Sequence, residues 1–176
     1  MYLRPAFAET DLSRIAALVT AHPFGVLVTR AADGMSASHI PFTVSRDGDV
    51  LVLEGHLGRA NPQSAQLAGG QGLPIFGGPH AYVSPSWYAT QPAVPTWDYA
   101  AVHVHGVLDA VDDAPSLHAM LRTLSVHDPH FDLDALDPQY RDGMVRGIRG
   151  FRLRAARIEA QWKMSQNRSA ADRAGV

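Results

Sequence analysis

The segment from His56 to Pro62 combines residue types that could bind an anion. It reads His-Leu-Gly-Arg-Ala-Asn-Pro and follows a predicted strand. Asn61 is a good N-cap and Pro62 a good first helical residue, so a short helix to Leu67 should follow. Backbone N–H groups and the helix dipole favour an anion there, and Arg59 could add a bidentate contact to a phosphate. The segment predicts a phosphate site of moderate specificity, because many helices begin with Asn-Pro.

Other polar and aromatic residues would complete a site for a flat aromatic phosphate ester. Ser38 and His39 lie on a neighbouring predicted strand and offer hydrogen-bonding edges. The rings that could cover a planar ligand are Tyr82, Trp87 and Trp97, and the donors near the C-terminus are Lys163, Gln166, Asn167 and Arg168. An isoalloxazine needs donors along one edge and aromatic or apolar faces. The equally favoured alternative is that Trp87 and Trp97 form a core or dimer-interface cluster, since aromatic residues dominate both settings.

The stretch from Phe76 to Gly106 is unusually rich in aromatic residues for a connection between strands. Connections longer than about twelve residues are usually either functional or disordered. This one is too aromatic to be disordered. We therefore interpret Pro85 to Trp97 as an ordered loop that closes over a pocket or seals a dimer seam.

Two histidines raise the possibility of a metal or haem site. His103 and His105 are two residues apart on a predicted strand, so their side chains share one face. A third ligand would have to come from His39, His56 or His80, and no HExxH-like spacing accompanies the pair. A hydrogen-bonding role is favoured, and no metal site is predicted.

Other enzyme chemistries lack their motifs. The sequence has no cysteine, which excludes a thiol nucleophile, and it has no GxSxG elbow or Rossmann fingerprint. No residue stands out as a general base, so we assign no catalytic residue.

The elements that must position these residues are mostly strands. The predicted strands are 24–29, 35–44, 50–55, 73–76, 81–84, 99–111 and 151–158. Helices should start at Thr10 or Asp11, near Asp113 and near Asp137, and a short polar helix should lie at the C-terminus. Asp-Gly pairs predict turns at 32–34 and 46–49. This pattern predicts a mainly β fold, a small closed β-barrel with helices at the periphery. We see no linker or repeat, so residues 1–176 should be one domain.

Charge and hydropathy narrow the function further. The net charge is −2 and the pI about 6.5, whereas nucleic-acid modules usually carry a basic face. The arginine-rich segment 146–157 is the candidate for DNA contact, although Arg152 and Arg154 alternate as on the solvent face of a strand. No apolar run could span a bilayer and no signal peptide is recognisable, so a cytoplasmic location is the default expectation. Lys163 is the single lysine.

Several stretches together resemble the PaiB-type FMN-binding regulators. They are FGVLVT, ASHIPF, GHLGRANPQ, GPHAYVSPSWY, PAVPTWDYAAVHVHG and WKMSQNRSAADRAGV, and they run from about Phe24 to Val176. The resemblance implies an FMN-binding split barrel related to the pyridoxamine phosphate oxidase and flavin reductase barrels. It also implies a homodimer with flavin at the subunit interface and a role as a negative transcriptional regulator.

The resemblance assigns roles to individual residues. It implies phosphate binding by His56, Arg59 and Asn61 and a flavin-edge position for Ser38 and His39. It also implies contact with the partner's flavin through Lys163, Gln166, Asn167 and Arg168. Trp97 joins the predicted cofactor-binding residues as a ring that could cover the flavin, which is inferred from its residue type. Gly58 stands where alanine is expected.

We therefore predict an FMN-binding split-barrel homodimer of the PaiB-like regulators with flavin-linked redox chemistry, regulatory sensing or both. One alternative is a DNA-binding repressor in which FMN is only a ligand or a remnant. A lower alternative is a haem- or metal-binding barrel that uses His103, His105 or another histidine.

Overall fold

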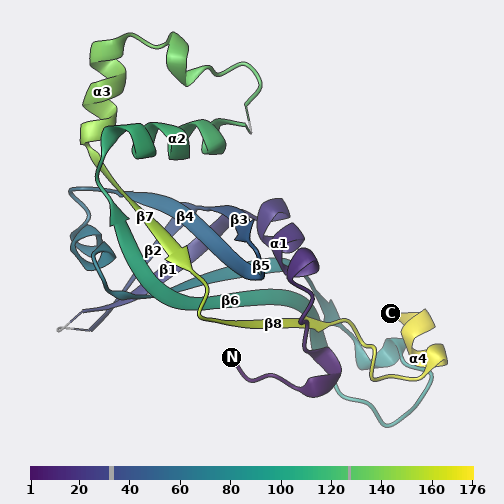
Figure 1. Ribbon diagram of the computed structural model, residues 1–176. Helices are drawn as coiled ribbons and strands as arrows, with labels where there is room; N and C mark the ends of the chain where they lie inside the picture. The colour runs from purple at the N-terminus through teal and green to yellow at the C-terminus, as the bar shows by residue number, and fades with distance from the viewer. Residues whose placement is uncertain (32–33, 127) are drawn as a thin grey trace.

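The computed structural model describes residues 1–31, 34–126 and 128–176. Within these ranges eight strands form one antiparallel sheet that curls into a barrel, and the helices lie outside it (Figure 1). The strands are β1 Phe24–Ala31, β2 Gly34–Pro41, β3 Thr43–Asp47, β4 Val50–Gly58, β5 Gln71–Val83, β6 Thr96–Val111, β7 Ile148–Arg154 and β8 Arg157–Lys163. The α-helices are α1 Leu12–Ala21, α2 Ala114–Ser125, α3 Pro138–Arg146 and α4 Ala170–Gly175. Short 3₁₀ helices are η1 Pro5–Phe7, η2 Pro62–Leu67, η3 Pro85–Trp87 and η4 Leu133–Ala135.

Strand β6 joins the two halves of the barrel. The strand order is β2-β1-β5-β6-β7-β4-β3, and β8 also pairs with β6. The first part of β6 pairs with β5 and β8, whereas its last residues, from Leu108, pair with β7. At Gly106 a Cβ atom would lie 2.5 Å from the carbonyl oxygen of Arg154, so the chain comes this close only without a side chain.

Two predicted strands are each divided in the structure. The predicted strand 35–44 breaks at Phe42, because β2 pairs with β1 while β3 pairs with β4. The predicted strand 151–158 is divided at residues 155–156, because β7 pairs with β4 and β8 with β6. In both places the chain crosses from one half of the barrel to the other, which periodicity cannot reveal.

The remaining predicted strands and helices differ less from the structure. The predicted strands 73–76 and 81–84 are one strand, β5, with an irregularity between Gly77 and His80. The predicted helix starts are confirmed: Asp11 accepts two backbone N–H groups at the start of α1, and Asp113 and Asp137 accept one each at the start of α2 and α3. Of the predicted turn at 32–34, Ala32 and Asp33 lie outside the described residues.

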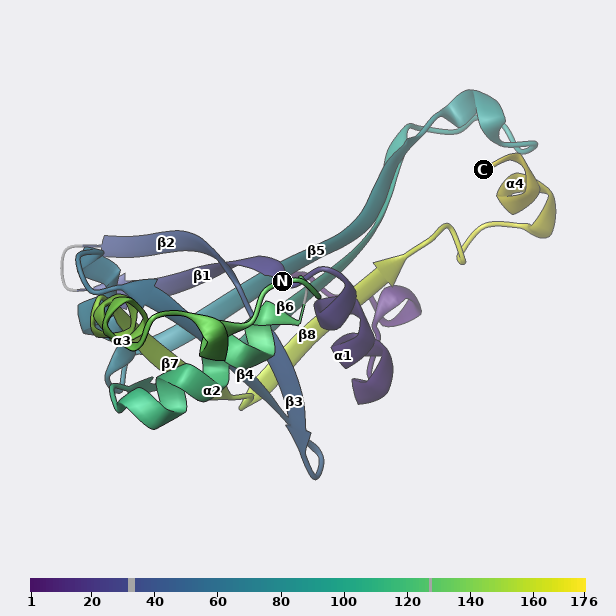
Figure 2. The ribbon, with the colours of Figure 1, turned by 90° about the horizontal axis from the view of Figure 1, so that it is seen from above.

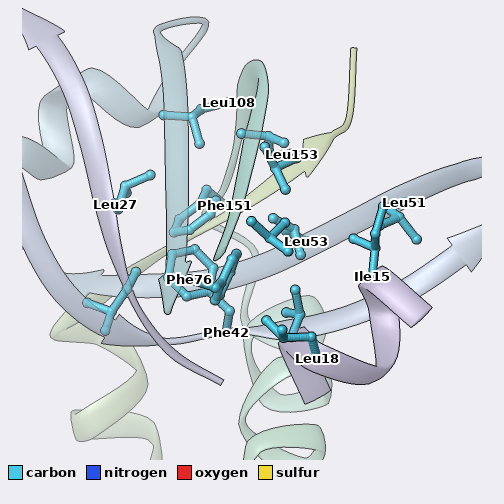
Figure 3. Close-up of a cluster of buried hydrophobic side chains, with 14 of the residues drawn as sticks. Ile15, Leu18, Leu27, Phe42, Leu51, Leu53, Phe76, Leu108, Phe151 and Leu153 are labelled. Carbon is cyan, nitrogen blue, oxygen red and sulfur yellow. The ribbon is translucent and has the colours of Figure 1, made fainter. Parts of the chain in front are cut away.

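Large apolar side chains fill the barrel (Figure 3). The ring of Phe42 contacts Phe76 and Phe151 edge-on, with centroids 5.0 and 5.9 Å apart. Ile15 and Leu18 of α1 join this cluster. Phe42 thus lies in the core where the predicted strand 35–44 breaks. Its buried ring fixes the chain at the point where it crosses from one half of the barrel to the other.

Helices α2 and α3 with η4 form a separate layer, which we call the helical cap. A second, small apolar cluster joins the cap to the barrel: Leu117, Met120 and Val145 of the cap pack with Val111 of β6. A Cβ at Gly150 of β7 would lie 2.8 Å from the Leu117 side chain, so α2 packs closely on β7. Figure 1 shows the cap at one side of the barrel.

The ends of β5 and β6 project from the barrel as a two-stranded arm (Figure 2). The arm pairs His80 with Tyr99 and Val83 with Thr96. The loop at its tip begins with η3, and α4 lies beside that loop in both views. None of the described helices is long and apolar enough to cross a membrane.

Candidate functional site

Asn61 links the end of the barrel to strand β2. Its Oδ1 accepts the backbone N–H of Gln63 at 2.9 Å, which caps η2 as the sequence predicted. Its Nδ2 donates to the Ser38 hydroxyl at 3.0 Å. Ser38 and Asn61, which the sequence placed in one site, therefore lie in direct contact.

Arg59 lies next to this pair but binds a residue that the sequence analysis did not single out. Its Nη2 donates to the Asp112 carboxylate at 2.7 Å, and Arg149 donates to the other carboxylate oxygen at 2.9 Å. Hydrogen bonds from Arg149 and Arg59 lower the pKa of Asp112. All three side chains are at least partly open to solvent. Two guanidinium groups on one carboxylate leave a net positive charge at this end of the barrel.

Polar side chains lie behind this charged group. Gln63 is buried, and its Nε2 donates to the Leu27 carbonyl at 3.0 Å and to the Thr29 hydroxyl at 2.9 Å. Gln66 reaches the Ser36 hydroxyl at 3.3 Å. Gln66 Oε1 also accepts the Thr29 hydroxyl. The Nε2 atoms of both glutamines and Gln66 Oε1 thus fix η2 against β1 and β2, so hydrogen bonds that are largely buried set the position of Asn61.

The two histidines predicted near this site have other neighbours. His39 is exposed on β2 and its ring stacks with that of Phe24, with centroids 6.2 Å apart. His56 lines an apolar cavity beneath the helical cap, and neither Arg59 nor Asn61 lines that cavity. The structure thus brings Ser38, Arg59 and Asn61 together and places His56 apart from them.

The other predicted site residues lie on the arm or pack against it. The ammonium of Lys163 donates to the Thr96 hydroxyl at 2.6 Å and also to the Trp97 carbonyl, so it ties the end of β8 to the start of β6. The Trp97 side chain is 54% exposed and meets the Tyr82 ring edge-on at 6.0 Å. The arm therefore offers an exposed aromatic surface beside the single lysine.

The tail after Lys163 packs on the arm tip. Arg168 places its guanidinium 4.4 Å from the centre of the Tyr88 ring, a cation–π contact. Asn167 and Arg168 line a small cavity with Tyr88 and Lys163. Gln166 binds the tail's own backbone, accepting from Met164 and donating to Trp162.

The predicted site residues form two groups, one around Arg59 and one around Lys163, and these lie on opposite sides of the folded molecule. Strand β2, which carries Ser38, is on one side of the barrel in Figure 2, and α4 with the arm tip is on the other. Figure 1 shows the same separation. A single chain does not bring Arg59 and Lys163 to one ligand.

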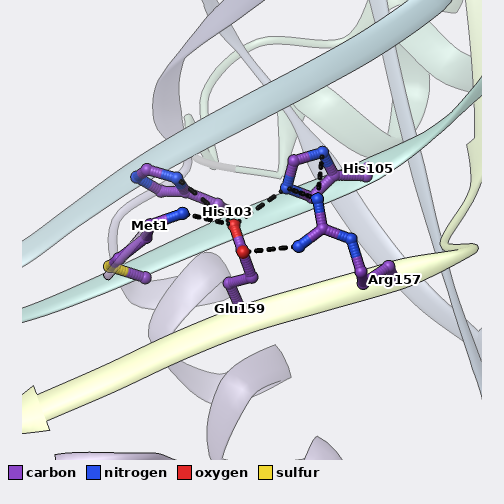
Figure 4. Close-up of polar contacts among 5 residues, drawn as sticks. All are labelled: Met1, His103, His105, Arg157 and Glu159. Carbon is purple, nitrogen blue, oxygen red and sulfur yellow. Dashed lines mark hydrogen bonds and ion pairs between the residues drawn. The ribbon is translucent and has the colours of Figure 1, made fainter. Parts of the chain in front are cut away.

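His103 and His105 surround a carboxylate (Figure 4). Glu159 of β8 accepts from the amino group of Met1 at 2.7 Å and lies 3.0 Å from His105 Nε2 and 4.0 Å from His103 Nδ1. Hydrogen bonds from the amino group, His105 and Arg157 lower the pKa of Glu159 to about 2. Across the part of the chain that the structure describes, no group of three or more ligand-type side chains is arranged to hold a metal ion.

The arginine-rich segment 146–157 makes ion pairs. Arg149 binds Asp112, Arg152 binds Glu54 at 2.6 Å, and Arg154 binds Asp47 at 2.6 Å. The predicted solvent-facing alternation of Arg152 and Arg154 is confirmed, since both are exposed. Neighbouring carboxylates offset much of the positive charge of this segment.

Comparison with known proteins gives a family and a fold. Residues 1–157 match the family described as "Putative FMN-binding domain". The chain is 34% identical to "Protease synthase and sporulation protein PAI 2" of Bacillus subtilis over 177 residues, covering 98% of this chain and 85% of that protein.

Among solved structures, the flavocytochrome Anf3 from Azotobacter vinelandii matches with a TM-score of 0.73 and 14% identity, covering 92% of this chain and 72% of its own. The FAD and heme binding protein from Mycobacterium smegmatis matches with a TM-score of 0.67 and 17% identity, covering 95% of this chain and 78% of its own. At these identities the matches show the fold alone, and they confirm the predicted split barrel.

Proposed function

Because this chain belongs to the FMN-binding domain family, whose cofactor is FMN, we propose that it works as a homodimer that holds FMN between two copies. In this proposal residues 1–176 form one FMN-binding split-barrel domain. Ser38, Arg59 and Asn61 of one copy, and Lys163, Trp97 and the tail of the other copy, bind the same cofactor.

The observation that carries the proposal is the arginine pair at Asp112. Arg59 and Arg149 already converge on one anionic group, with distances of 2.7 and 2.9 Å to its two oxygens. A phosphate monoester presents the same kind of oxygens and more negative charge, so it can compete with the carboxylate for both guanidinium groups. The residues present at this end of the barrel therefore fit the phosphate of FMN.

The ring system would be recognised by residues of both ends. Ser38 and His39 offer hydrogen-bonding groups on β2, while Trp97 and Tyr82 offer exposed ring faces on the arm. These groups lie far apart in one chain (Figure 2). A second copy whose arm reaches across the barrel would join them, as in a two-fold symmetric dimer.

Bound FMN supplies hydride and single-electron transfer, the chemistry of flavins. The protein's part is to bind the phosphate through arginines, to hold the ring edge through Ser38, and to shield one ring face with Trp97. Lys163 adds a positive point charge beside Trp97, held by Thr96. Flavin-linked redox chemistry or sensing is the activity that this set of residues supports.

A DNA-binding role has less support. The arginines that could form a basic surface are paired with Asp47, Glu54 and Asp112. Gel-shift titrations at two salt concentrations would decide between these roles. Salt-sensitive binding of duplex DNA by the FMN-loaded protein would favour the regulator.

Titration with FMN and riboflavin tests the phosphate assignment. The wild-type protein should change the visible spectrum and quench the fluorescence of FMN. Arg59→Ala and Arg149→Ala should each lower the affinity for FMN about 10- to 100-fold, because each removes a charge-assisted hydrogen bond to the phosphate. Neither change should alter the affinity for riboflavin, which lacks the phosphate.

Arg152→Ala is the matched control, since it removes an exposed arginine from the same strand as Arg149 but one that binds Glu54. It should leave both affinities unchanged. If Arg59→Ala lowers the affinities for FMN and riboflavin equally, Arg59 does not bind the phosphate. If the wild-type protein causes no spectral change in FMN, the proposal of FMN binding is rejected.

A further inference from the structure

The cavity beneath the helical cap is separate from the proposed FMN site. It has a volume of about 340 Å³ and lies between the cap and strands β4 and β7. The residues that line it include His56, Leu121, Leu133, Leu136, Met144 and Ile148. Arg59, Asp112 and Arg149 are absent from its lining, so this cavity is a second and chemically different space.

The wall of the cavity is apolar and part of it is left uncovered. Tyr140 and Met144 on α3 are 59% and 57% exposed, although both line the cavity. Phe131 also lines it and is partly exposed. Aromatic and methionine side chains at the mouth of an apolar cavity are typical of ligand pockets, because they adapt to the shape of a ligand.

The polar groups of the cavity narrow the ligand class. The Ser125 hydroxyl donates to the Leu121 carbonyl at 2.7 Å and is thereby satisfied. His56 is different: its Nδ1 is buried, and no side chain or backbone atom of the described residues forms a hydrogen bond with it. Burial lowers the pKa of His56, so its ring is neutral near pH 7. A neutral imidazole carries one donor and one acceptor. Because Nδ1 is buried, a hydroxyl group in the cavity would pair with the other ring nitrogen, Nε2, or with Nδ1 once the ring turns towards the cavity.

The volume of the cavity limits the size of the ligand. An engineered apolar cavity of about 150 Å³ holds one benzene ring, so about 340 Å³ admits one or two fused rings. We propose that this cavity is a second ligand site, for a small aromatic molecule of one or two rings whose hydroxyl group forms a hydrogen bond with His56. Such a ligand would touch both α3 and the barrel and would join the cap to β4.

Calorimetric titration of the FMN-loaded protein with 2-naphthol, and with naphthalene as its hydroxyl-free counterpart, tests the proposal. The wild-type protein should bind 2-naphthol saturably and about 2- to 10-fold more tightly than naphthalene, the effect of one hydrogen bond. His56→Phe keeps a ring of similar size, so it should retain naphthalene binding and lose the preference for 2-naphthol. Met144→Trp should fill the cavity and abolish binding of both probes.

Met35→Trp is the matched control, since it places the same indole at an exposed methionine of β2 that does not line the cavity. It should bind both probes as the wild-type protein does. The proposal is overturned if neither probe binds saturably, if His56→Phe keeps the 2-naphthol preference, or if Met144→Trp binds both probes normally. Release of FMN by 2-naphthol would also overturn it, because the probe would then occupy the flavin site.

Discussion

At the scale of single residues, Glu159 shows how one carboxylate organises the polar face of β6 and β8. Three different cationic or donor groups converge on it from Met1, His105 and Arg157. His103 also faces it at 4.0 Å. The histidine pair that suggested a metal site in the sequence thus has a protein carboxylate as its partner.

Glu159→Gln should lower the free energy of unfolding by about 1–3 kcal/mol at pH 7, because it removes charge-assisted hydrogen bonds. The folded-state pKa is depressed from 4.5 to about 2, so the stabilisation is present above 4.5 and is lost as the pH falls towards 2. Urea unfolding at pH 7 and pH 2.5 should show a large difference between variant and wild type at pH 7 and a small one at pH 2.5. An equal difference at both values would contradict this account.

At the scale of elements, β6 must bend where it passes from one half of the barrel to the other. Gly106 lies at this point, between the residues that pair with β8 and those that pair with β7. Because Gly106 has no side chain, the Arg154 carbonyl and the Leu153 side chain can occupy the space that a Cβ atom would take.

Gly106→Ala should destabilise the protein by about 1–3 kcal/mol, the usual effect of overpacking a core. The built Cβ meets backbone oxygen at 2.5 Å and Leu153 at 2.9 Å, so backbone must move. Gly77→Ala is the control, because nothing lies within 4 Å of its Cβ position. Thermal unfolding of both variants would contradict the prediction if Gly106→Ala melts at or above the temperature of Gly77→Ala.

The arm tip depends on a second element, α4. Asp172 is buried and its carboxylate accepts the backbone N–H of Thr90 in the loop at 2.8 Å. That hydrogen bond lowers the pKa of Asp172. The carboxylate therefore fastens a helix at the C-terminus to a loop 82 residues earlier in the chain.

Asp172→Ala should free the loop while the barrel stays folded, because the arm lies outside the barrel core. Hydrogen exchange should become faster at the backbone amides of residues 88–94, with little change in the strands of the barrel. Arg173→Ala, an exposed change in the same helix, is the control. Unchanged protection of the Thr90 amide in Asp172→Ala would show that α4 does not hold the loop.

At the scale of the whole molecule, the separation of Arg59 from Lys163 requires a second chain if both bind one FMN. Mixing two variants tests this directly. Arg59→Ala and Lys163→Ala should each bind FMN weakly, but a mixed dimer would contain one site with both residues intact. After unfolding and refolding together, about one quarter of all sites should recover tight FMN binding, as expected for random two-fold pairing.

Sedimentation should give the mass of two chains for wild-type protein and for the mixture. No recovery of tight sites, with dimers present, would show that both residues act within one chain or that one of them does not bind FMN. A monomer by sedimentation would reject the shared site altogether.

What the sequence determined by itself is local. The aspartates that cap three helices, the alternation that puts His103 and His105 on one face of a strand, and the Asn-Pro start of η2 all depend on neighbours within a few residues. Local periodicity therefore predicted the mainly β barrel and most of its helices. The motif around Arg59 was also visible, because its residues are adjacent in the chain.

The tertiary structure decided everything that depends on distant pairing. It broke two predicted strands, because their halves find different partners. It brought Arg149 to Arg59 through Asp112, a meeting of three chain segments that no spacing rule could indicate. His56 lines a cavity that is closed by helices about 65 to 90 residues later in the chain. The arm, in turn, lies far from the group of residues around Arg59. Strand pairing and helix packing set these positions, and both depend on long-range contacts rather than on neighbouring residues.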